Sequence, residues 1–62
     1  MFNAFRVSQR VKFIDPDSFD PRIGQGYEVR GRITYIDGDL MQVIQDGKTF
    51  AIWMKSPALL PE

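Results

Sequence analysis

The chain of 62 residues contains no cysteine and no histidine. Without cysteine it can form no disulfide bond, and it offers neither a thiolate nucleophile nor a Cys-type zinc site. Without histidine it lacks the imidazole base of Ser-His catalysis and a common metal ligand. We therefore expect a protein that is not an enzyme and that binds no metal or other cofactor.

The sequence also lacks a net charge and a long apolar run. Eight Lys and Arg residues balance eight Asp and Glu residues, whereas a dedicated nucleic-acid-binding protein is usually basic. No stretch approaches the roughly 18 apolar residues that indicate a transmembrane helix, and residues 1–13 contain no continuous apolar segment of the signal-peptide kind. We therefore expect a cytoplasmic protein with no membrane partner.

The chain length is that of one small domain, and the 44% hydrophobic content is that of a globular protein. A chain this short buries only about 60% of its unfolded surface, so its stability is marginal. Because disulfides and Cys or His metal sites are excluded, the remaining stabilising devices are tight local structure and self-association. The sequence thus favours homo-oligomerisation.

Turn-forming residues recur at short intervals and divide the chain into short β-rich runs, which is typical of an all-β sandwich or barrel. The turn signals are Asp15-Pro16, Asp20-Pro21, residues 24–26, Asp37-Gly38, Asp46-Gly47 and Ser56-Pro57. We expect strands over residues 10–14, 26–37, 40–45 and 48–55, then one helical turn and a short closing strand. Residues 1–9 are expected to form an arm or a short helix outside a barrel of residues 10–62.

A long loop over residues 15–25 follows the first predicted strand. Phe19 and Ile23 are expected to fold back onto the body of the protein and to anchor this loop. Its three aspartates superficially suggest a calcium site, but the glycine and terminal glutamate of an EF-hand loop are missing. Asp is frequent in turns because its carboxylate accepts hydrogen bonds from nearby backbone N–H groups, so turn formation is the better explanation.

Two glycine turns set the expected register of the sheet. A three-residue loop at residues 37–39 places Tyr35 opposite Met41, so that the apolar faces of three strands coincide. A two-residue type I′ turn at Asp46-Gly47 places Val43 opposite Phe50. The expected core is Val11, Phe13, Tyr27, Val29, Ile33, Tyr35, Met41, Val43, Phe50, Ile52 and Met54. Gly31, on the apolar face of a long strand, indicates a bend or a close approach of another backbone.

This register leaves an apolar band on the opposite face, where Ile36, Leu40 and Trp53 lie side by side across three strands. Arg30 and Arg32 continue the same face. An exposed Trp with flanking Arg has the composition of an interface, and both are frequent hot-spot residues. We therefore predict that these five residues bind another protein or a second copy of the chain.

The band has an alternative explanation within the chain itself. The N-terminal arm carries Phe2 and Phe5, and the long loop carries Phe19. Any of these side chains could pack over Trp53 and cover the band. The sequence leaves both arrangements open.

Basic residues are concentrated in the first half of the chain and make nucleic acid the alternative ligand. A basic stripe would consist of Arg6, Arg10, Lys12, Arg30 and Arg32. Such side chains contact phosphates, while an aromatic ring such as Tyr27 or Trp53 provides a stacking platform for a base. Acidic residues nearby in the sequence equally allow a solvated face of mixed charge.

The strand order and turn placement of residues 10–62 resemble an SH3-like barrel, with five strands in a meander, a long first loop and a single helical turn before the last strand. Residues 9–12 (Gln-Arg-Val-Lys) and 29–33 (Val-Arg-Gly-Arg-Ile) are loosely similar to KOW- and Tudor-type barrels of ribosomal and transcription proteins. That resemblance implies RNA or protein binding. A small barrel of this kind also suits a phage or a mobile element.

Residues 50–53 (Phe-Ala-Ile-Trp) are distantly similar to plasmid-borne type II dihydrofolate reductases, short SH3-like chains whose active site forms only in a tetramer. Ala51 and Trp53 stand where that family has the Gln and Tyr of a Val-Gln-Ile-Tyr motif. The resemblance therefore implies assembly without the activity. An enzyme formed at an oligomer interface is disfavoured, because so small a chain has few buried polar groups to preorganise a site.

Overall fold

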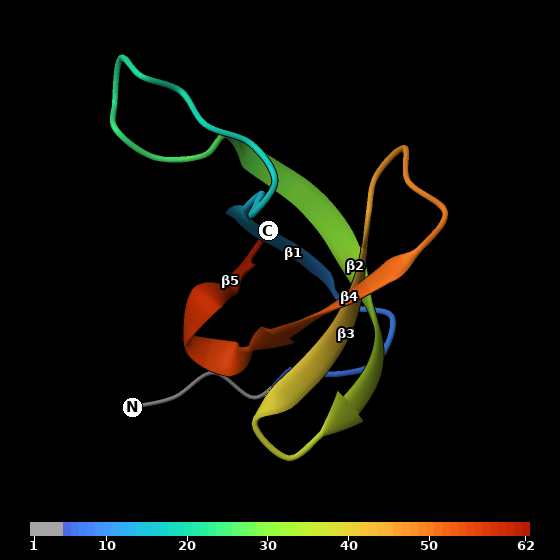
Figure 1. Ribbon diagram of the computed structural model, residues 1–62. Coiled ribbons are helices and arrows are strands. Elements are labelled where there is room, and N and C mark those ends of the chain that lie inside the picture. The colour runs from blue at the N-terminus through green and yellow to red at the C-terminus, as the bar shows by residue number, and fades with distance from the viewer. Residues whose placement is uncertain (1–4) are drawn as a thin grey trace.

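The computed structural model describes residues 5–62, whose five β-strands form one antiparallel sheet that curls on itself (Figure 1). The elements are β1 (Arg10–Ile14), β2 (Glu28–Asp37), β3 (Leu40–Gln45), β4 (Ala51–Lys55), the 3₁₀ turn η1 (Ser56–Ala58) and β5 (Leu60–Pro61). Their order across the sheet is β4-β3-β2-β1-β5. The predicted all-β meander, with a long first loop and one helical turn before the last strand, is confirmed.

η1 is the only helical segment in this part of the chain. Its three residues are far too few to cross a bilayer. The turn connects the two edge strands, β4 and β5 (Figure 1).

β2 lies at the centre of the sheet and pairs with β1 through its first half and with β3 through its second half. Where these two pairings overlap, which we call the crossover, Gly31 pairs with both Val11 of β1 and Gln45 of β3. A Cβ atom on Gly31 would lie 2.5 Å from the carbonyl oxygen of Ile44. The close backbone approach predicted for this glycine is therefore confirmed.

Apolar side chains from four segments meet on the concave side of the sheet. The buried core consists of Val11, Phe13, Ile33, Met41, Val43 and Leu59, and the half-buried residues packed against it are Phe5, Val29, Ile36, Ile52 and Met54. Leu59 was not predicted. It enters the core because its backbone N–H donates to the carbonyl oxygen of Ser56 (3.1 Å), which turns the tail back over the sheet.

The predicted register between β2 and β3 is wrong beyond Ile33. Asp37 pairs with Leu40, so the connecting turn contains two residues rather than three. The extra residue lies instead in β2, as a β-bulge between Ile33 and Tyr35. Because one added residue reverses the side-chain alternation of a strand, Ile36 faces Met41 and the core, and Tyr35 turns outward.

The predicted register between β3 and β4 is wrong by two residues. Val43 pairs with Ile52 rather than with Phe50, so the connection spans residues 46–50. The turn is displaced because the backbone N–H of Asp46 donates to the Arg30 carbonyl oxygen (2.9 Å), which prolongs the pairing with β2. Because the shift is by an even number of residues, each side chain of β4 stays on its predicted face. Phe50, however, lies in the connection and is 56% exposed. Its assignment to the core is wrong.

The long first loop extends away from the sheet (Figure 1) and is not anchored by its apolar residues. Phe19 and Ile23 are 62% and 61% exposed, so the prediction that they fold back is wrong. Polar contacts hold the loop instead. The backbone N–H of Asp20 donates to the Gln25 carbonyl oxygen (2.7 Å), and the buried carboxylate of Asp20 accepts from the Arg22 guanidinium (2.8 Å).

The arm before β1 contains no helix over residues 5–9. Phe5 packs against the core, and the backbone N–H of Ser8 donates to the Ile33 carbonyl oxygen (2.7 Å). Phe2 lies outside the described residues. Phe5 therefore lies against the inner side of the sheet, and neither it nor the exposed Phe19 covers Trp53, which is half exposed.

Replacement of Gly31 tests the crossover. Gly31→Ala should lower the free energy of unfolding by about 1–3 kcal/mol, because its Cβ would collide with the β3 backbone and force the strands apart. Urea denaturation followed by circular dichroism measures this change. The control Arg32→Ala, at the neighbouring exposed position, should stay within about 0.5 kcal/mol of the wild type. Equal losses in the two variants would contradict the close approach.

Candidate binding surface

The β-bulge determines which residues reach the outer face, the side of β2, β3 and β4 turned away from the core. Ile36, predicted for this face, is half-buried against the core, and so it is absent from the surface. Tyr35 takes its place and is 53% exposed. Leu40 and Trp53 lie on the outer face as predicted by the alternation of their strands. The apolar band therefore exists with one member exchanged.

Tyr35 and Trp53 form an aromatic pair on the outer face. Both lie opposite Gln42 of the middle strand, one from each side. Their ring centroids are 6.1 Å apart and their planes meet at 88°, the edge-to-face arrangement that aromatic quadrupoles favour by about 0.5–1.5 kcal/mol. We define the outer-face patch as Tyr35, Leu40, Gln42, Ile44 and Trp53. The sequence missed Tyr35 because nothing local reveals the bulge.

The basic residues of the predicted stripe come from β1 and β2, which are neighbours. Arg10 lies opposite Arg32, and Lys12 lies opposite Arg30. These positions alternate with the core residues of both strands, so their side chains share the outer side of the sheet. Four of the five predicted residues are thus brought together. Arg6 lies apart from them, in the arm before β1.

Tyr27 is not brought to the basic residues. Its carbonyl oxygen accepts a hydrogen bond from the Asp15 N–H (2.9 Å), which continues the pairing of β1 with β2 by one step. Because side chains alternate along a strand, Tyr27 then lies on the inner face, whereas Arg30 lies on the outer face. The aromatic rings that share a face with the basic residues are those of Tyr35 and Trp53.

Like charges directly opposite one another destabilise a sheet, and two acidic residues relieve the Arg10–Arg32 pair. Both Arg10 Nη atoms donate to the Asp46 carboxylate (2.8 and 2.5 Å), and Arg10 Nε donates to Glu62 Oε2 (3.1 Å). The bond from Arg10, together with the nearby charges of Arg32 and Arg30, lowers the pKa of Asp46. The Asp46 carboxylate likewise raises the pKa of Arg10.

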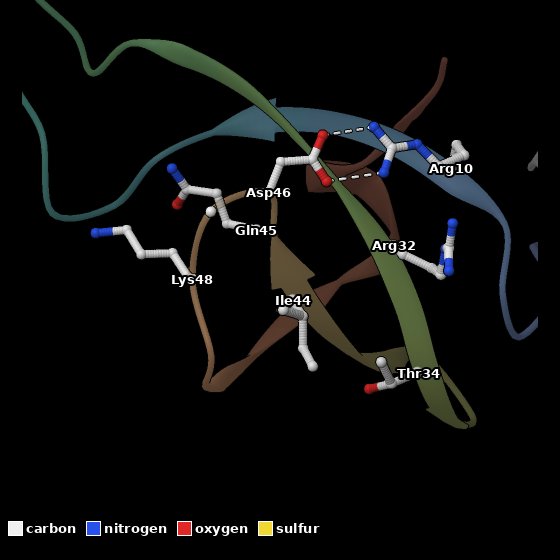
Figure 2. Close-up of a pocket in the computed structure, with 8 residues that line it drawn as sticks. Arg10, Arg32, Thr34, Ile44, Gln45, Asp46 and Lys48 are labelled. Carbon is white, nitrogen blue, oxygen red and sulfur yellow. Dashed lines mark hydrogen bonds and ion pairs between the residues drawn. The ribbon is translucent and has the colours of Figure 1, made fainter.

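Between these groups lies a shallow depression of about 390 Å³ (Figure 2). Ile44 lies near its middle, with Arg32 on one side and Lys48 on the other, and the Arg10–Asp46 pair closes one end. Thr34 lies at the other end. An apolar centre with a charged rim suits a ligand that combines an apolar and an ionic group.

The long loop provides no cation site within the described residues. No group of three His, Cys, Asp or Glu side chains there lies close enough to hold a metal ion. The Asp15 carboxylate accepts from the backbone N–H of Asp17 (2.9 Å), which is the turn-forming role predicted for this residue. The Asp20 carboxylate is occupied by Arg22.

Comparison with known proteins adds no functional assignment to this geometry. The chain matches no protein-family model, no curated protein and no solved structure.

The Arg10–Asp46 pair predicts a pH dependence of stability. The lowered pKa of Asp46 means that the ionised carboxylate stabilises the fold above the usual Asp pKa of about 3.9, and that this contribution is lost as the pH falls further. Asp46→Asn should therefore unfold at lower urea concentration than the wild type at pH 7, and the difference should shrink below about pH 4.

The matched control is Asp17→Asn, because Asp17 makes no ion pair within residues 5–62. Its urea midpoint should follow that of the wild type throughout a pH series. A constant deficit of Asp46→Asn from pH 7 to pH 2 would show that the ionic contact with Arg10 is not what stabilises the fold.

Proposed function

We propose that this chain is a non-enzymatic binding module that recognises another protein through the outer-face patch. The observation that carries the proposal is the exposed edge-to-face pair of Tyr35 and Trp53. Tyr, Trp and Arg dominate the binding energy of protein interfaces, and Arg32 lies on the same face. Because the two rings already hold each other in place, they lose little side-chain entropy when a partner covers them.

The SH3-like resemblance of the chain supports a binding role. The strand order, the long first loop and the position of η1 before β5 agree with that resemblance. Since one fold hosts many functions, the resemblance supports a scaffold and the patch supports its use. The cytoplasmic location expected from the sequence stays part of this proposal.

Nucleic acid is the second candidate ligand, and the opposed basic residues of β1 and β2 favour it. Arg30 and Arg32 make no ion pair within residues 5–62, so both guanidinium groups are available to phosphate oxygens. A single strand that follows β2 would place phosphates on these groups and a base against the Tyr35–Trp53 pair.

Alanine substitution tests the protein-binding proposal. Trp53→Ala and Tyr35→Ala should each weaken binding of an identified protein partner by about 2 kcal/mol, or about 30-fold in Kd, because each removes a ring from the centre of the patch. Partners captured with the wild-type chain would be titrated by calorimetry. Phe19→Ala is the matched control, because Phe19 is also an exposed aromatic residue but lies outside the patch. Equal binding by all four proteins would reject the patch.

A titration with single-stranded oligonucleotides separates the second candidate from the first. Trp53 is the only tryptophan of the chain, so its fluorescence reports directly on a base that stacks against it. A nucleic-acid-binding role predicts quenching at low salt, loss of affinity as salt is added, and a smaller salt dependence in Arg30→Ala and Arg32→Ala. An unchanged Trp53 signal at low salt would reject nucleic acid.

A further inference from the structure

The edge strand β4 carries apolar side chains on both of its faces. Residues 50–54 read Phe-Ala-Ile-Trp-Met. Ile52 and Met54 are half-buried against the core, whereas Trp53 points to the outer face, and Phe50, just before the strand, is exposed. A continuous apolar run is typical of a strand that is covered on both faces and paired on both sides. β4 therefore lies at the edge of the sheet, although its composition is typical of an inner strand.

The two edges of this sheet are protected very differently. β5 has two residues, one of which is Pro61, and short strands and proline both discourage pairing with another chain. β4 has five residues with no proline, and its register with β3 is uninterrupted by a bulge. Within residues 5–62, no backbone hydrogen bond reaches its free side. β4 thus presents an unblocked row of backbone donors and acceptors.

We propose that β4 pairs with β4 of a second copy of this chain, antiparallel and about a two-fold axis at Trp53. The pairing would place Ile52 opposite Met54 of the partner subunit, and Trp53 opposite Trp53 of the partner subunit. Apolar side chains then meet apolar side chains on both faces, which is the self-complementarity that an isologous interface requires. The occupant of the edge is a second copy because the strand complements itself.

Charge permits the same arrangement. Lys55 is the only charged residue of β4, and it would lie opposite Ala51 of the partner subunit. The two Lys55 ammonium groups would be separated by about four residues of strand, or about 13 Å. That exceeds the Debye length of about 8 Å at physiological ionic strength, so their repulsion is screened.

Pairing would also enlarge the surface that binds a partner protein, although it does not depend on the proposed function. Opposed side chains in a sheet lie about 4.5–5.5 Å apart at Cβ, so the outer faces of the two copies would join. The Tyr35–Trp53 pair of one copy would then continue into that of the other as a row of four rings. Assembly uses the backbone of the edge, whereas partner binding uses the rings on the face.

Analytical ultracentrifugation of the full chain from micromolar to millimolar concentration tests the proposal. The wild type should pass from the 7.2 kDa monomer to a dimer as its concentration rises. In the dimer, hydrogen–deuterium exchange of the amides of residues 51–55 should slow with increasing concentration. A monomer at every concentration, or growth beyond the dimer, would overturn β4 pairing.

Two lysine variants separate edge pairing from stacking of the outer faces. Trp53→Lys places two ammonium groups opposite each other at the axis and should raise the dimer dissociation constant at least tenfold. Tyr35→Lys introduces the same charge on the same face, but on the central strand β2, where it opposes no copy of itself. It should keep the dimer while it weakens partner binding. Dimer loss in both variants, or in neither, would overturn the proposal.

A direct contact measurement does not depend on how well a variant folds. In a mixture of ¹³C-labelled and unlabelled wild-type chains, filtered NMR spectra should show contacts between the Ile52 side chain and Met54 of the partner subunit. A dimer without these contacts would contradict the proposed register. Circular dichroism of each lysine variant confirms that it is folded before its assembly is compared.

Discussion

The arrangement depends on the close passage of β2 over β3 at Gly31. The Ile44 carbonyl oxygen occupies the space that a side chain at this position would need. At the same residue β2 pairs with β1 on one side and with β3 on the other. Val11, Ile33 and Val43 then meet in one core. A chain this short could not stabilise two separate cores, so this contact makes the fold feasible.

The β-bulge just beyond this crossover links the fold to the proposed site. The added residue sends Ile36 to the core and Tyr35 to the surface, where Tyr35 meets Trp53. A three-residue turn would have satisfied the core equally well with Tyr35 in the place of Ile36. The apolar pattern of the sequence is compatible with both, since two adjacent residues can each supply an apolar side chain opposite Met41. Only the three-dimensional pairing decides between them.

Much of the fold could be predicted from the sequence, because strand alternation and turn residues are local signals. The strands and the tight approach at Gly31 follow from them, whereas the grouping of Arg10 with Arg32 also requires that β1 pairs with β2. The β3–β4 register could not be predicted, since the turn signal at Asp46 is overridden by bonds to Arg10 and to the Arg30 backbone. These contacts join distant parts of the chain, which no local pattern contains. Arg10, Lys12, Arg30 and Arg32 are thus brought together as predicted, whereas Arg6 and Tyr27 are not, and Tyr35 takes the place of Ile36 on the outer face.

Two acidic residues compensate part of the positive charge on the outer face. Opposed Arg and Lys side chains on β1 and β2 repel one another. Asp46 and Glu62 form ion pairs with Arg10 and reduce this repulsion. Both acidic residues bind Arg10, so Arg32 makes no ion pair within residues 5–62 and shares the outer face with the aromatic pair. A guanidinium group without an ion pair and two half-exposed rings on one face are side chains that often dominate binding energy at protein interfaces. Charge balance over the whole chain is thus compatible with a surface locally prepared for binding.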